Sequence, residues 1–297
     1  MANSGTIARV VVTGASGFLG RHVAQQCVDR GIAVLAPLRR SVDIPAGVEP
    51  LSLDDAGWHT GIADFAPDAI LHVAAWSSLS HRRADIDPII DANIRFGAHL
   101  IEAAAECENP PALVWAGSFA QYADGGDAYA PNSFYAASKE AFRAIADYYD
   151  RMRGVRCLGL ILHDIYGARD ERGRLLSLIA ATLAREPGGL DLTDGSQHIA
   201  FVHVEDAARA FLVAADHLCR GTQSGNPVYS VAGDDRRPLR EQIGDLLRAE
   251  DDPARLRWGA RPQPPSFTPD LPELPRLPGW QPTIMLKEGF EEVRAHV

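Results

Sequence analysis

A tyrosine and a lysine stand four residues apart in the stretch YAASK, at Tyr135 and Lys139. Residues at this spacing lie one turn apart on the same face of a helix, so the phenol and the ammonium can address one site. A nearby cation favours deprotonation of a phenol, whose reference pKa is about 10. The pair is therefore suited to proton transfer, and the lysine can also bond ribose hydroxyls. The chain has 29 basic residues and nearly all are arginine, which makes this lysine a candidate functional residue.

Three glycines are regularly spaced in TGASGFLG, between a strand expected at 8–12 and a helix expected at 18–30. In this context the first glycine allows a tight turn, the second lets the backbone approach a pyrophosphate, and the third lets helix and strand pack closely. The helix N-terminus then faces the phosphates. A plain turn rarely requires three glycines at this spacing, so we predict a dinucleotide site. Its expected contacts are Gly14, Ser16, Gly17, Phe18, Leu19 and Gly20.

The residues after the second expected strand indicate which dinucleotide is bound. NAD binders usually place an acidic residue there to accept hydrogen bonds from the ribose 2′-OH. This chain has Leu38 followed by Arg39 and Arg40, and guanidinium groups suit a 2′-phosphate. We therefore predict NADP(H), with Arg39 and Arg40 as cofactor contacts and NAD(H) as the alternative. The competing interpretation is that both arginines only decorate a solvated loop.

Short apolar runs alternate with helix-like segments up to about residue 165, which is typical of βα units that form a parallel sheet. We predict an α/β fold: a Rossmann-type, doubly wound parallel sheet in residues 1–165, and a smaller C-terminal substrate-binding lobe in residues 166–297, with some segments returning to the main domain. The expected strands are 8–12, 32–38, 68–75, 111–117 and 155–162, and the expected helices are 18–30, 85–107 and 133–152.

Composition limits the partners. The formal net charge of −10 disfavours nucleic acid and anionic membrane surfaces. The four cysteines lack the spacing of a zinc site or a disulfide framework, no other cluster suggests a metal, and no segment approaches membrane-spanning length. The chain runs almost directly into its first strand without a leader-like stretch, so we expect a cytoplasmic protein without metal.

TGASGFLG and YAASK together resemble the extended branch of the short-chain dehydrogenase/reductase superfamily, the nucleotide-sugar epimerases, dehydratases and reductases. Further segments match that branch in order over nearly the whole chain: HVAA (72–75), WAGSFAQYAD (115–124), DIYG (164–167), FVHVEDAARA (201–210) and GWQP (279–282). The resemblance implies that Ser118, Tyr135 and Lys139 are catalytic and that Ala74, Asn93, Tyr135 and Lys139 contact the cofactor. It also implies a homodimer paired through the helices near 85–107 and 133–152.

The resemblance further narrows the reaction. Dehydratases of the branch usually carry an Asp-Glu pair after the catalytic hydroxyl residue, whereas Ser118 is followed here by Phe119 and Ala120. The chain is most similar to 4-ketoreductases that act on nucleotide-linked 4-keto-6-deoxyhexoses. We therefore expect NADPH-dependent reduction of a sugar keto group, with Tyr135 as proton donor. The alternatives are an NAD-dependent nucleotide-sugar 4-epimerase and, less expected, a non-catalytic NADP-sensing regulator.

The expected substrate contacts rest on their positions beside these motifs. They are Trp76, Ser77, Asp164, Arg174 and His198. Each has a competing structural interpretation, because a loop tryptophan can be a packing anchor and the basic residues can belong to a solvated loop. His72 and His163, at strand ends in apolar surroundings, are interpreted as structural.

Overall fold

The computed structural model describes residues 7–77, 82–184, 188–221, 225–264 and 270–297. In this part of the chain, seven strands form one parallel sheet in the order β10-β6-β5-β4-β1-β2-β3. Their bounds are β1 Arg9–Thr13, β2 Ala33–Leu38, β3 Val48–Ser52, β4 Ala69–His72, β5 Ala112–Ser118, β6 Cys157–Leu162 and β10 Val228–Val231. This strand order is that of a doubly wound sheet, so the predicted fold class is confirmed.

The central strands are apolar along their whole length because both faces of the sheet are covered by helices. β4, β5 and β6 are buried at every residue. The five predicted strands correspond to β1, β2, β4, β5 and β6, with bounds shifted by up to three residues. The sequence analysis missed β3, an edge strand that contains Glu49 and Pro50.

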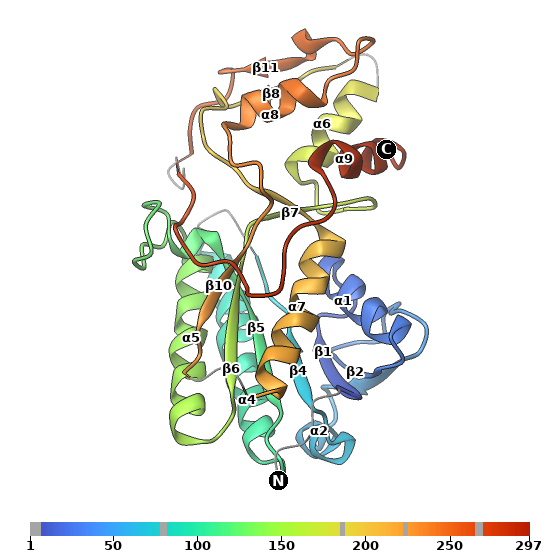
Figure 1. Cartoon of the computed structure of the whole chain (residues 1–297), viewed down its shortest axis with the longest axis vertical. Helices are drawn as coiled ribbons and strands as arrows, with labels where there is room; N and C mark the ends of the chain where they lie inside the picture. Colours follow the sequence, from blue (N-terminus) through green and yellow to red (C-terminus); the bar gives the residue numbers. More distant parts are fainter. Residues whose placement is uncertain (1–6, 78–81, 185–187, 222–224, 265–269) are drawn as a thin grey trace.

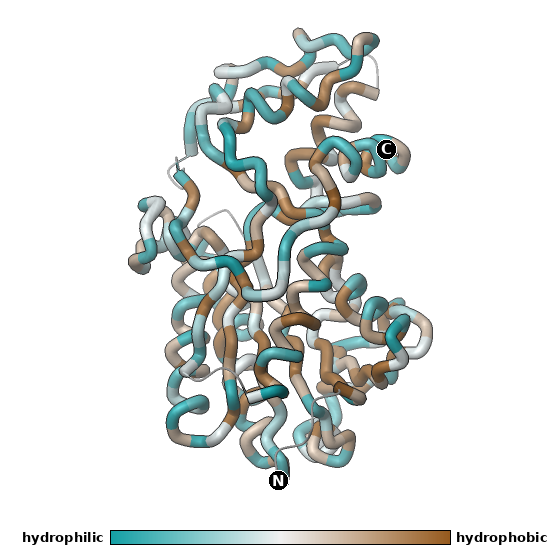
Figure 2. The backbone as a smooth tube through the Cα atoms, viewed as in Figure 1, coloured by the Kyte–Doolittle hydropathy of each residue, from teal (hydrophilic) through white to brown (hydrophobic). Residues whose placement is uncertain are grey.

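Helices cover the sheet in two layers (Figure 1). One layer packs α1 (Phe18–Asp29) and α7 (Val204–Cys219) against the strands in one apolar cluster. The other packs α2 (Trp58–Phe65), α4 (Phe96–Ala105) and α5 (Phe134–Met152) in a second cluster. Hydrophobic residues run along the strands between these layers (Figure 2). The sheet is therefore a buried platform, and its loops at the carboxyl ends of the strands are free to build a site.

The helix predicted at 85–107 is broken into several segments. A 3₁₀ turn (Arg83–Asp85) leads into α3 (Ile86–Ile89), a π-helical stretch (Ile90–Arg95) and then α4. The π stretch contains one buried polar residue, Asn93. Wide turns of this kind often occur at functional sites, where they redirect a side chain. The predicted helix is therefore present up to Ala105, and what the sequence did not predict is its π stretch, because apolar periodicity does not distinguish α from π turns.

A smaller lobe lies above the sheet in Figure 1 and has its own apolar cluster. Two short parallel strand pairs contribute to it, β8 (Leu190–Leu192) with β11 (Leu256–Trp258), and β7 (Asp164–Tyr166) with β9 (Phe201–His203). Its helices are α6 (Leu175–Ala184), α8 (Leu239–Leu246) and α9 (Leu286–Arg294), and a 3₁₀ turn spans Pro253–Arg255. α7 and β10 follow residue 165 in sequence but pack in the main sheet layer. The domain boundary near residue 165 stays a prediction.

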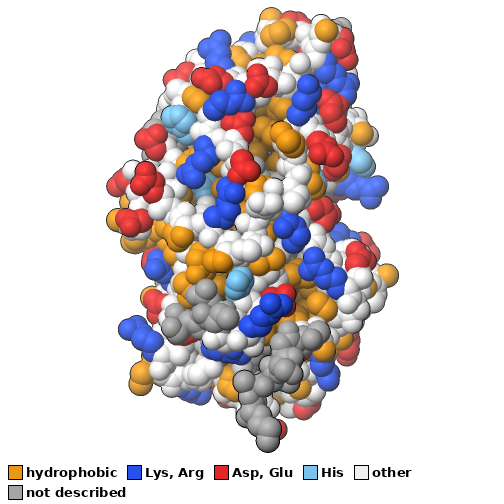
Figure 3. Space-filling view, in the orientation of Figure 1, with side chains coloured by type: hydrophobic (Ala, Val, Ile, Leu, Met, Phe, Trp, Pro, Cys, Tyr) orange, Lys and Arg blue, Asp and Glu red, His pale blue; other side chains and the backbone are white. Residues whose placement is uncertain are grey.

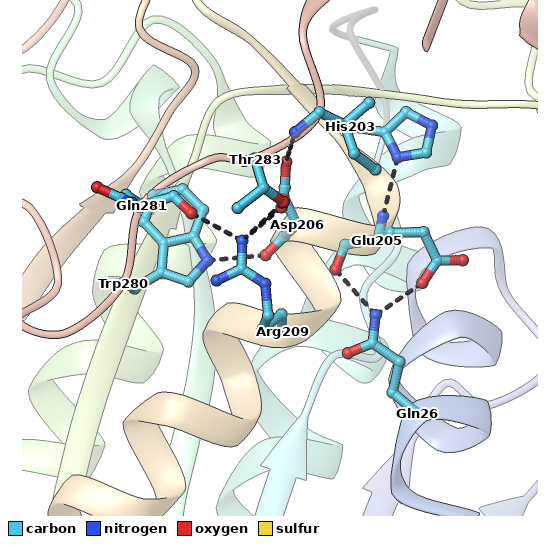
Figure 4. A network of polar contacts seen from close by, with 9 residues as sticks. Gln26, His203, Glu205, Asp206, Arg209, Trp280, Gln281 and Thr283 are labelled. Carbon is cyan, nitrogen blue, oxygen red and sulfur yellow. Dashed lines mark hydrogen bonds and ion pairs between the residues drawn. The ribbon is translucent and has the colours of Figure 1, made fainter. Parts of the chain in front are cut away.

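The C-terminal segment crosses from the small lobe to the sheet layer and returns to the lobe in α9 (Figure 1). Asp206, near the start of α7, binds this segment at Thr283 and Ile284, just before α9. Its buried carboxylate accepts hydrogen bonds from the Thr283 hydroxyl (2.7 Å), the Thr283 amide (2.8 Å) and the Ile284 amide (2.9 Å), and pairs with Arg209 (Figure 4). The Trp280 indole donates to the Asp206 carbonyl at 2.9 Å. Asp206 therefore joins α7 to the C-terminal segment.

The neighbouring residue Glu205 joins α7 to α1 on the other side (Figure 4). Its carboxylate bonds His22 Nδ1 at 2.6 Å and Gln26 Nε2 at 2.6 Å. Glu205 and Asp206 thus connect three segments that are distant in sequence. Charged side chains of both signs are interspersed on the face in Figure 3. No helix in the described ranges is both long and apolar enough to cross a membrane.

Replacing Asp206 by asparagine should lower the free energy of unfolding by about 3 kcal/mol, because Arg209 and the Thr283 and Ile284 donors lose a buried carboxylate. Burial alone would raise the pKa of Asp206, but these hydrogen bonds hold it below its usual value. Its stabilising effect is therefore present above the unfolded pKa and is lost as the pH falls through the lower folded pKa. Urea denaturation measures both effects.

The matched control is Asp216→Asn on the same helix, where an exposed pair with Arg220 at 3.8 Å should be worth less than about 1 kcal/mol. Equal losses in the two variants would contradict the role given to Asp206.

Candidate functional site

The glycine loop has the geometry that its spacing predicts. Gly14 has φ of +74°, and its carbonyl accepts from the Gly17 amide at 2.8 Å in a tight turn. A Cβ on Gly20 would lie 2.0 Å from the Gly14 oxygen, so only glycine allows α1 to pack this closely on the loop. The turn and packing roles of the first and third glycines are confirmed. Contact of this loop with a cofactor stays a prediction.

The start of α1 suits an anion. Gly17 caps the helix without a side-chain hydrogen bond, and the first turn contains no acidic residue. Ser16 and Gly17 are exposed, Phe18 is half-buried, and Leu19 and Gly20 are buried. Free backbone amides at a helix N-terminus favour phosphate groups. The residues present therefore fit the diphosphate of a dinucleotide.

The loop lies at the point where the strand order reverses. β1 and β4 are neighbours in the sheet, and the chain leaves them toward helices on opposite faces. At their carboxyl ends the Thr13 hydroxyl bonds His72 Nδ1 at 2.8 Å and accepts from the Ala74 amide at 3.0 Å. A Cβ on Gly14 would lie 3.0 Å from the Ala74 backbone. Open α/β sheets bind ligands in the crevice at such a reversal.

His72 is neutral and structural in this position. Burial, with a smaller effect from Lys139, lowers its pKa to about 3. Its ring lies 5.0 Å from that of Phe142 in an edge-on arrangement. The interpretation of His72 as structural therefore agrees with its surroundings. The sequence analysis missed only its partner, Thr13.

Asn93 fastens the loop after β4 to α5. Its Oδ1 accepts from the Trp76 amide at 2.8 Å, and its Nδ2 donates to the Trp76 carbonyl (3.1 Å) and to Ser138 Oγ (2.9 Å). Ser138 in turn donates to the Tyr135 carbonyl at 2.7 Å. Asn93 thus positions the loop that carries Ala74 against the helix that carries Tyr135 and Lys139. Its predicted contact with the cofactor stays a prediction.

Ser118, Tyr135 and Lys139 meet at the carboxyl end of β5. Ser118 ends β5, and its side chain is hydrogen-bonded to Tyr135. Tyr135 and Lys139 lie in the first two turns of α5, and Lys139 Nζ is 5.8 Å from the centre of the tyrosine ring. The structure therefore brings together the three residues that the sequence analysis selected as catalytic.

A capping interaction holds Ser118 in place. The Ser118 hydroxyl accepts from the Ala120 amide at 3.3 Å, and the Ser118 amide donates to Gln121 Oε1 at 2.9 Å. Gln121 is fully buried and donates to Glu140 of α5 at 2.7 Å. The sequence analysis did not identify Gln121, although the spacing Ser-x-x-Gln is the signal of a capping box.

Burial sets the proton affinity of the site. It raises the pKa of Tyr135 to about 12, against the lowering effects of Arg174, the Ser118 hydrogen bond and Arg172. It lowers the pKa of Lys139 to about 8. The sequence analysis expected Lys139 to supply the main cationic field, whereas in the protein alone Arg174 has the largest opposing effect. At neutral pH Tyr135 therefore holds its proton.

Asp164 and Arg174 also belong to this charged group. Asp164 begins β7 and is half-buried. Burial raises its pKa to about 6, and the positive charges of Arg174 and Arg172 oppose the rise. Asp164 therefore shares its two cationic neighbours, Arg174 and Arg172, with Tyr135. Their contact with substrate stays a prediction.

The remaining predicted contacts lie further out. Trp76, with 43% of its surface exposed, and Ser77 are on the loop after β4. His198 is exposed and pairs with Asp270 at 3.3 Å. It lines a hollow with Asp124, Gly125, Arg236, Asp270, Leu271 and Glu273. Asp164 and Arg174 are not among the residues that line this hollow. Among the described residues, no three His, Cys, Asp or Glu side chains are placed to hold a metal ion.

Arg39 and Arg40 follow β2 and are both exposed. Asp43, an acidic residue shortly after this strand, is already paired with Arg21 of α1. The Arg21 guanidinium donates to Asp43 Oδ2 at 3.0 Å and to its carbonyl at 2.9 Å. One oxygen of the Asp43 carboxylate is thus paired with Arg21, while the side chain stays largely exposed.

The doubly wound sheet, the glycine loop and the Ser118, Tyr135 and Lys139 group define an enzyme of the dinucleotide-binding α/β class. Comparison with protein families makes this assignment specific. The chain belongs to the NAD dependent epimerase/dehydratase family, whose model matches residues 10–232. This family belongs to the extended short-chain dehydrogenase/reductase type that the sequence resemblance implied.

The chain shares about a quarter of its aligned residues with curated relatives. The chain is 25% identical over 251 residues to UDP-glucuronate 4-epimerase 3 of Arabidopsis thaliana, covering 75% of this chain but 58% of that protein. It is 25% identical over 224 residues to CDP-abequose synthase of Salmonella typhimurium, covering 70% of each. With GDP-6-deoxy-D-mannose reductase of Pseudomonas aeruginosa it shares 25% identity over 314 residues, covering 96% of this chain and 95% of that one.

Solved structures show the same fold over the full length. UDP-glucose 4-epimerase from Brucella ovis, in complex with NAD, superposes with a TM-score of 0.82 at 20% identity and covers 97% of this chain and 98% of that chain. The enzyme from Thermus thermophilus, also in complex with NAD, gives 0.77 at 23% identity, with coverage of 97% and 98%. The small lobe is therefore part of the shared architecture.

Thr13→Val should open the loop at the strand-order reversal. The variant leaves the buried His72 nitrogen and the Ala74 amide without a partner, which should lower the free energy of unfolding by about 2 kcal/mol. Exchange of the Ala74 amide hydrogen, followed by NMR, should accelerate. Thr13→Ser is the control, because it keeps the hydroxyl and should keep this amide protected. Equal exchange rates in the two variants would show that the hydroxyl does not fasten the loop.

Proposed function

We propose that this protein uses NADPH to reduce the keto group of a nucleotide-linked sugar, with a 4-keto-6-deoxyhexose as the favoured substrate. The observation that carries the choice of cofactor is the pair of exposed arginines after β2, at the place where NAD binders usually have an acidic residue. A 2′-phosphate needs cationic partners, whereas a 2′-OH needs a free acceptor. Similarity to CDP-abequose synthase and GDP-6-deoxy-D-mannose reductase supports the reaction class.

The site residues divide the work of a reduction. When bound, the reduced nicotinamide supplies a hydride to the carbonyl carbon and is itself oxidised. Ser118 donates a hydrogen bond to the carbonyl oxygen, and Tyr135 transfers its proton to that oxygen, so a hydride and a proton together convert the ketone to an alcohol. Lys139 bonds the ribose hydroxyls. The phenolate left on Tyr135, near Arg174 and Lys139, then takes a proton from solvent.

Tyr135 can serve as the proton donor of this step. Burial raises its pKa to about 12, so the phenol is protonated at neutral pH. An epimerase uses the same three residues in both directions, so the choice of reduction rests on the cofactor and on the relatives named above. An NAD-dependent 4-epimerase remains the alternative, and similarity to UDP-glucuronate 4-epimerase 3 favours it.

A test of the reaction is incubation with a nucleotide-linked 4-keto-6-deoxyhexose. We expect one NADPH to be consumed for each sugar reduced, measured by absorbance of the cofactor and by chromatography of the sugar. Conversion of a nucleotide hexose without net cofactor change would instead establish an epimerase. Tyr135→Phe should abolish turnover while the affinity for NADPH stays within about twofold, because the ring is kept and only the proton donor is lost. A variant with full turnover would exclude Tyr135 as the proton donor, and absence of turnover in the wild type with NADPH bound would favour the regulator.

Replacing Arg39 and Arg40 together by alanine should weaken NADPH binding at least tenfold more than NADH binding. The reason is that charge-assisted bonds to a 2′-phosphate are lost, whereas NADH has no such group. Fluorescence titration of both cofactors measures the difference. Arg220→Ala, which removes an exposed arginine directly after α7, is the control and should change neither affinity. Equal losses of affinity for both cofactors in the double variant would show that Arg39 and Arg40 do not bind the 2′-phosphate.

We also propose that two copies pair through α4 and α5. The support is the exposure of Tyr148 (50%) and Met152 (69%) on the outer face of α5. A mass of one chain by light scattering would contradict this. A cytoplasmic location stays a prediction, supported by four cysteines that are all unpaired.

A further inference from the structure

The loop between β7 and α6 reaches the first residue of α1. A Cβ on Gly167 would lie 3.3 Å from Phe18 Cζ. Later in the same loop, the Arg172 guanidinium carbon lies 4.5 Å from the centre of the Phe18 ring. A segment that leads into the small lobe therefore contacts the helix that follows the glycine loop.

Arg172 is held rigidly in this position. Its Nε donates to Asp170 Oδ1 at 2.6 Å, and its Nη2 donates to Asp170 Oδ2 at 2.8 Å and to the Ile165 carbonyl at 3.2 Å. The Asp170 side chain has no exposed surface, whereas 36% of the Arg172 side chain is exposed. A two-point bond to a buried carboxylate fixes the plane of a guanidinium. Nη1 takes part in none of these three bonds and keeps two N–H groups.

This fixed cation stands beside an uncapped helix N-terminus. Gly17 has no side-chain cap, and the first turn of the twelve-residue α1 has no acidic residue to neutralise it. In a doubly wound fold this N-terminus faces the diphosphate of the dinucleotide. The positive charges of Arg172 and Arg174 also lower the pKa of Tyr135, so both guanidiniums lie within electrostatic range of the proposed proton donor.

We propose that Arg172 is a further cofactor-binding residue, which donates from the small-lobe side to the diphosphate of the bound dinucleotide. The inference rests on the proposed dinucleotide site. It differs from the role of Arg39 and Arg40, because the diphosphate is common to NADPH and NADH whereas the 2′-phosphate is not. Asp170 is then a positioning residue that acts through Arg172.

Binding to the full chain tests the proposal without turnover. Three ligands with a diphosphate are titrated by calorimetry, NADPH, NADH and ADP-ribose, together with adenosine, which has none. Arg172→Gln should weaken all three diphosphate ligands about tenfold, as expected for loss of one charge-assisted bond, and should leave adenosine unchanged. The wild-type affinities should also fall more steeply with salt than those of the variant.

Two further variants keep the result interpretable. Asp170→Asn combined with Arg172→Gln removes both charges, so no buried carboxylate is left unpaired, and it should show the same tenfold loss. Arg169→Gln is the matched control, because Arg169 is an exposed arginine in the same loop. Its φ of +59° is unfavourable for arginine and glutamine alike, so the substitution adds no backbone strain. It should bind all four ligands as the wild type does. Thermal unfolding confirms that each variant is folded.

Each outcome decides the question. Wild-type affinity of the double variant for the three diphosphate ligands would overturn the proposal. Weakening of NADPH alone would mean that Arg172 contacts the 2′-phosphate instead, and weakening of adenosine as well would mean a purely structural role. Failure of the wild type to bind any dinucleotide would reject the proposed function together with this inference.

Discussion

The hydrogen bond between Thr13 and His72 fixes the carboxyl ends of β1 and β4 where the sheet changes winding direction. β1 continues from this point into the glycine loop, and β4 continues into the loop that contains Ala74. The backbones of the two loops are close enough to require glycine at position 14. The pair is buried, and the neutral imidazole adds no charge beneath Lys139. The hydrogen bond therefore maintains the shape of the crevice, and the neutral imidazole leaves the positive charge of the crevice unchanged.

The second constraint is the connection between the lobes. Glu205 and Asp206 are adjacent in α7, yet one binds α1 and the other binds the segment leading to α9. A shift of α7 would be transmitted in both directions, toward the cofactor helix and toward the small lobe. The Asp206 carboxylate is buried and accepts from several donors, so each lost bond would leave a polar group unsatisfied, whereas the Glu205 carboxylate is partly exposed. The Asp206 bonds therefore tie the segment that leads to α9 to the main sheet layer.

The sequence predicted those features that depend on local pattern. Continuous apolar runs revealed the central strands, and the glycine spacing revealed a turn that the structure builds with a positive φ at Gly14. It did not reveal β3, because an edge strand with Glu49 and Pro50 lacks the apolar signal of buried strands. The proton affinity of Tyr135 and the clamp on Arg172 depend on groups brought together only by folding. Residue type and helical spacing located the tyrosine, but burial determined its pKa.

The last strand of the main sheet comes late in the chain. β6 ends at Leu162, and its neighbour β10 begins at Val228, after β7, α6, β8 and β9 of the small lobe. During synthesis the free edge of β6 is therefore unprotected for several seconds at ribosomal rates of about 5–20 residues per second. The edge of β10 is in turn bonded by the C-terminal segment, from the Ser230 amide to the Pro275 carbonyl at 2.8 Å. An open apolar edge invites pairing with other chains, so the newly made protein depends on its final third to remain monodisperse while it folds.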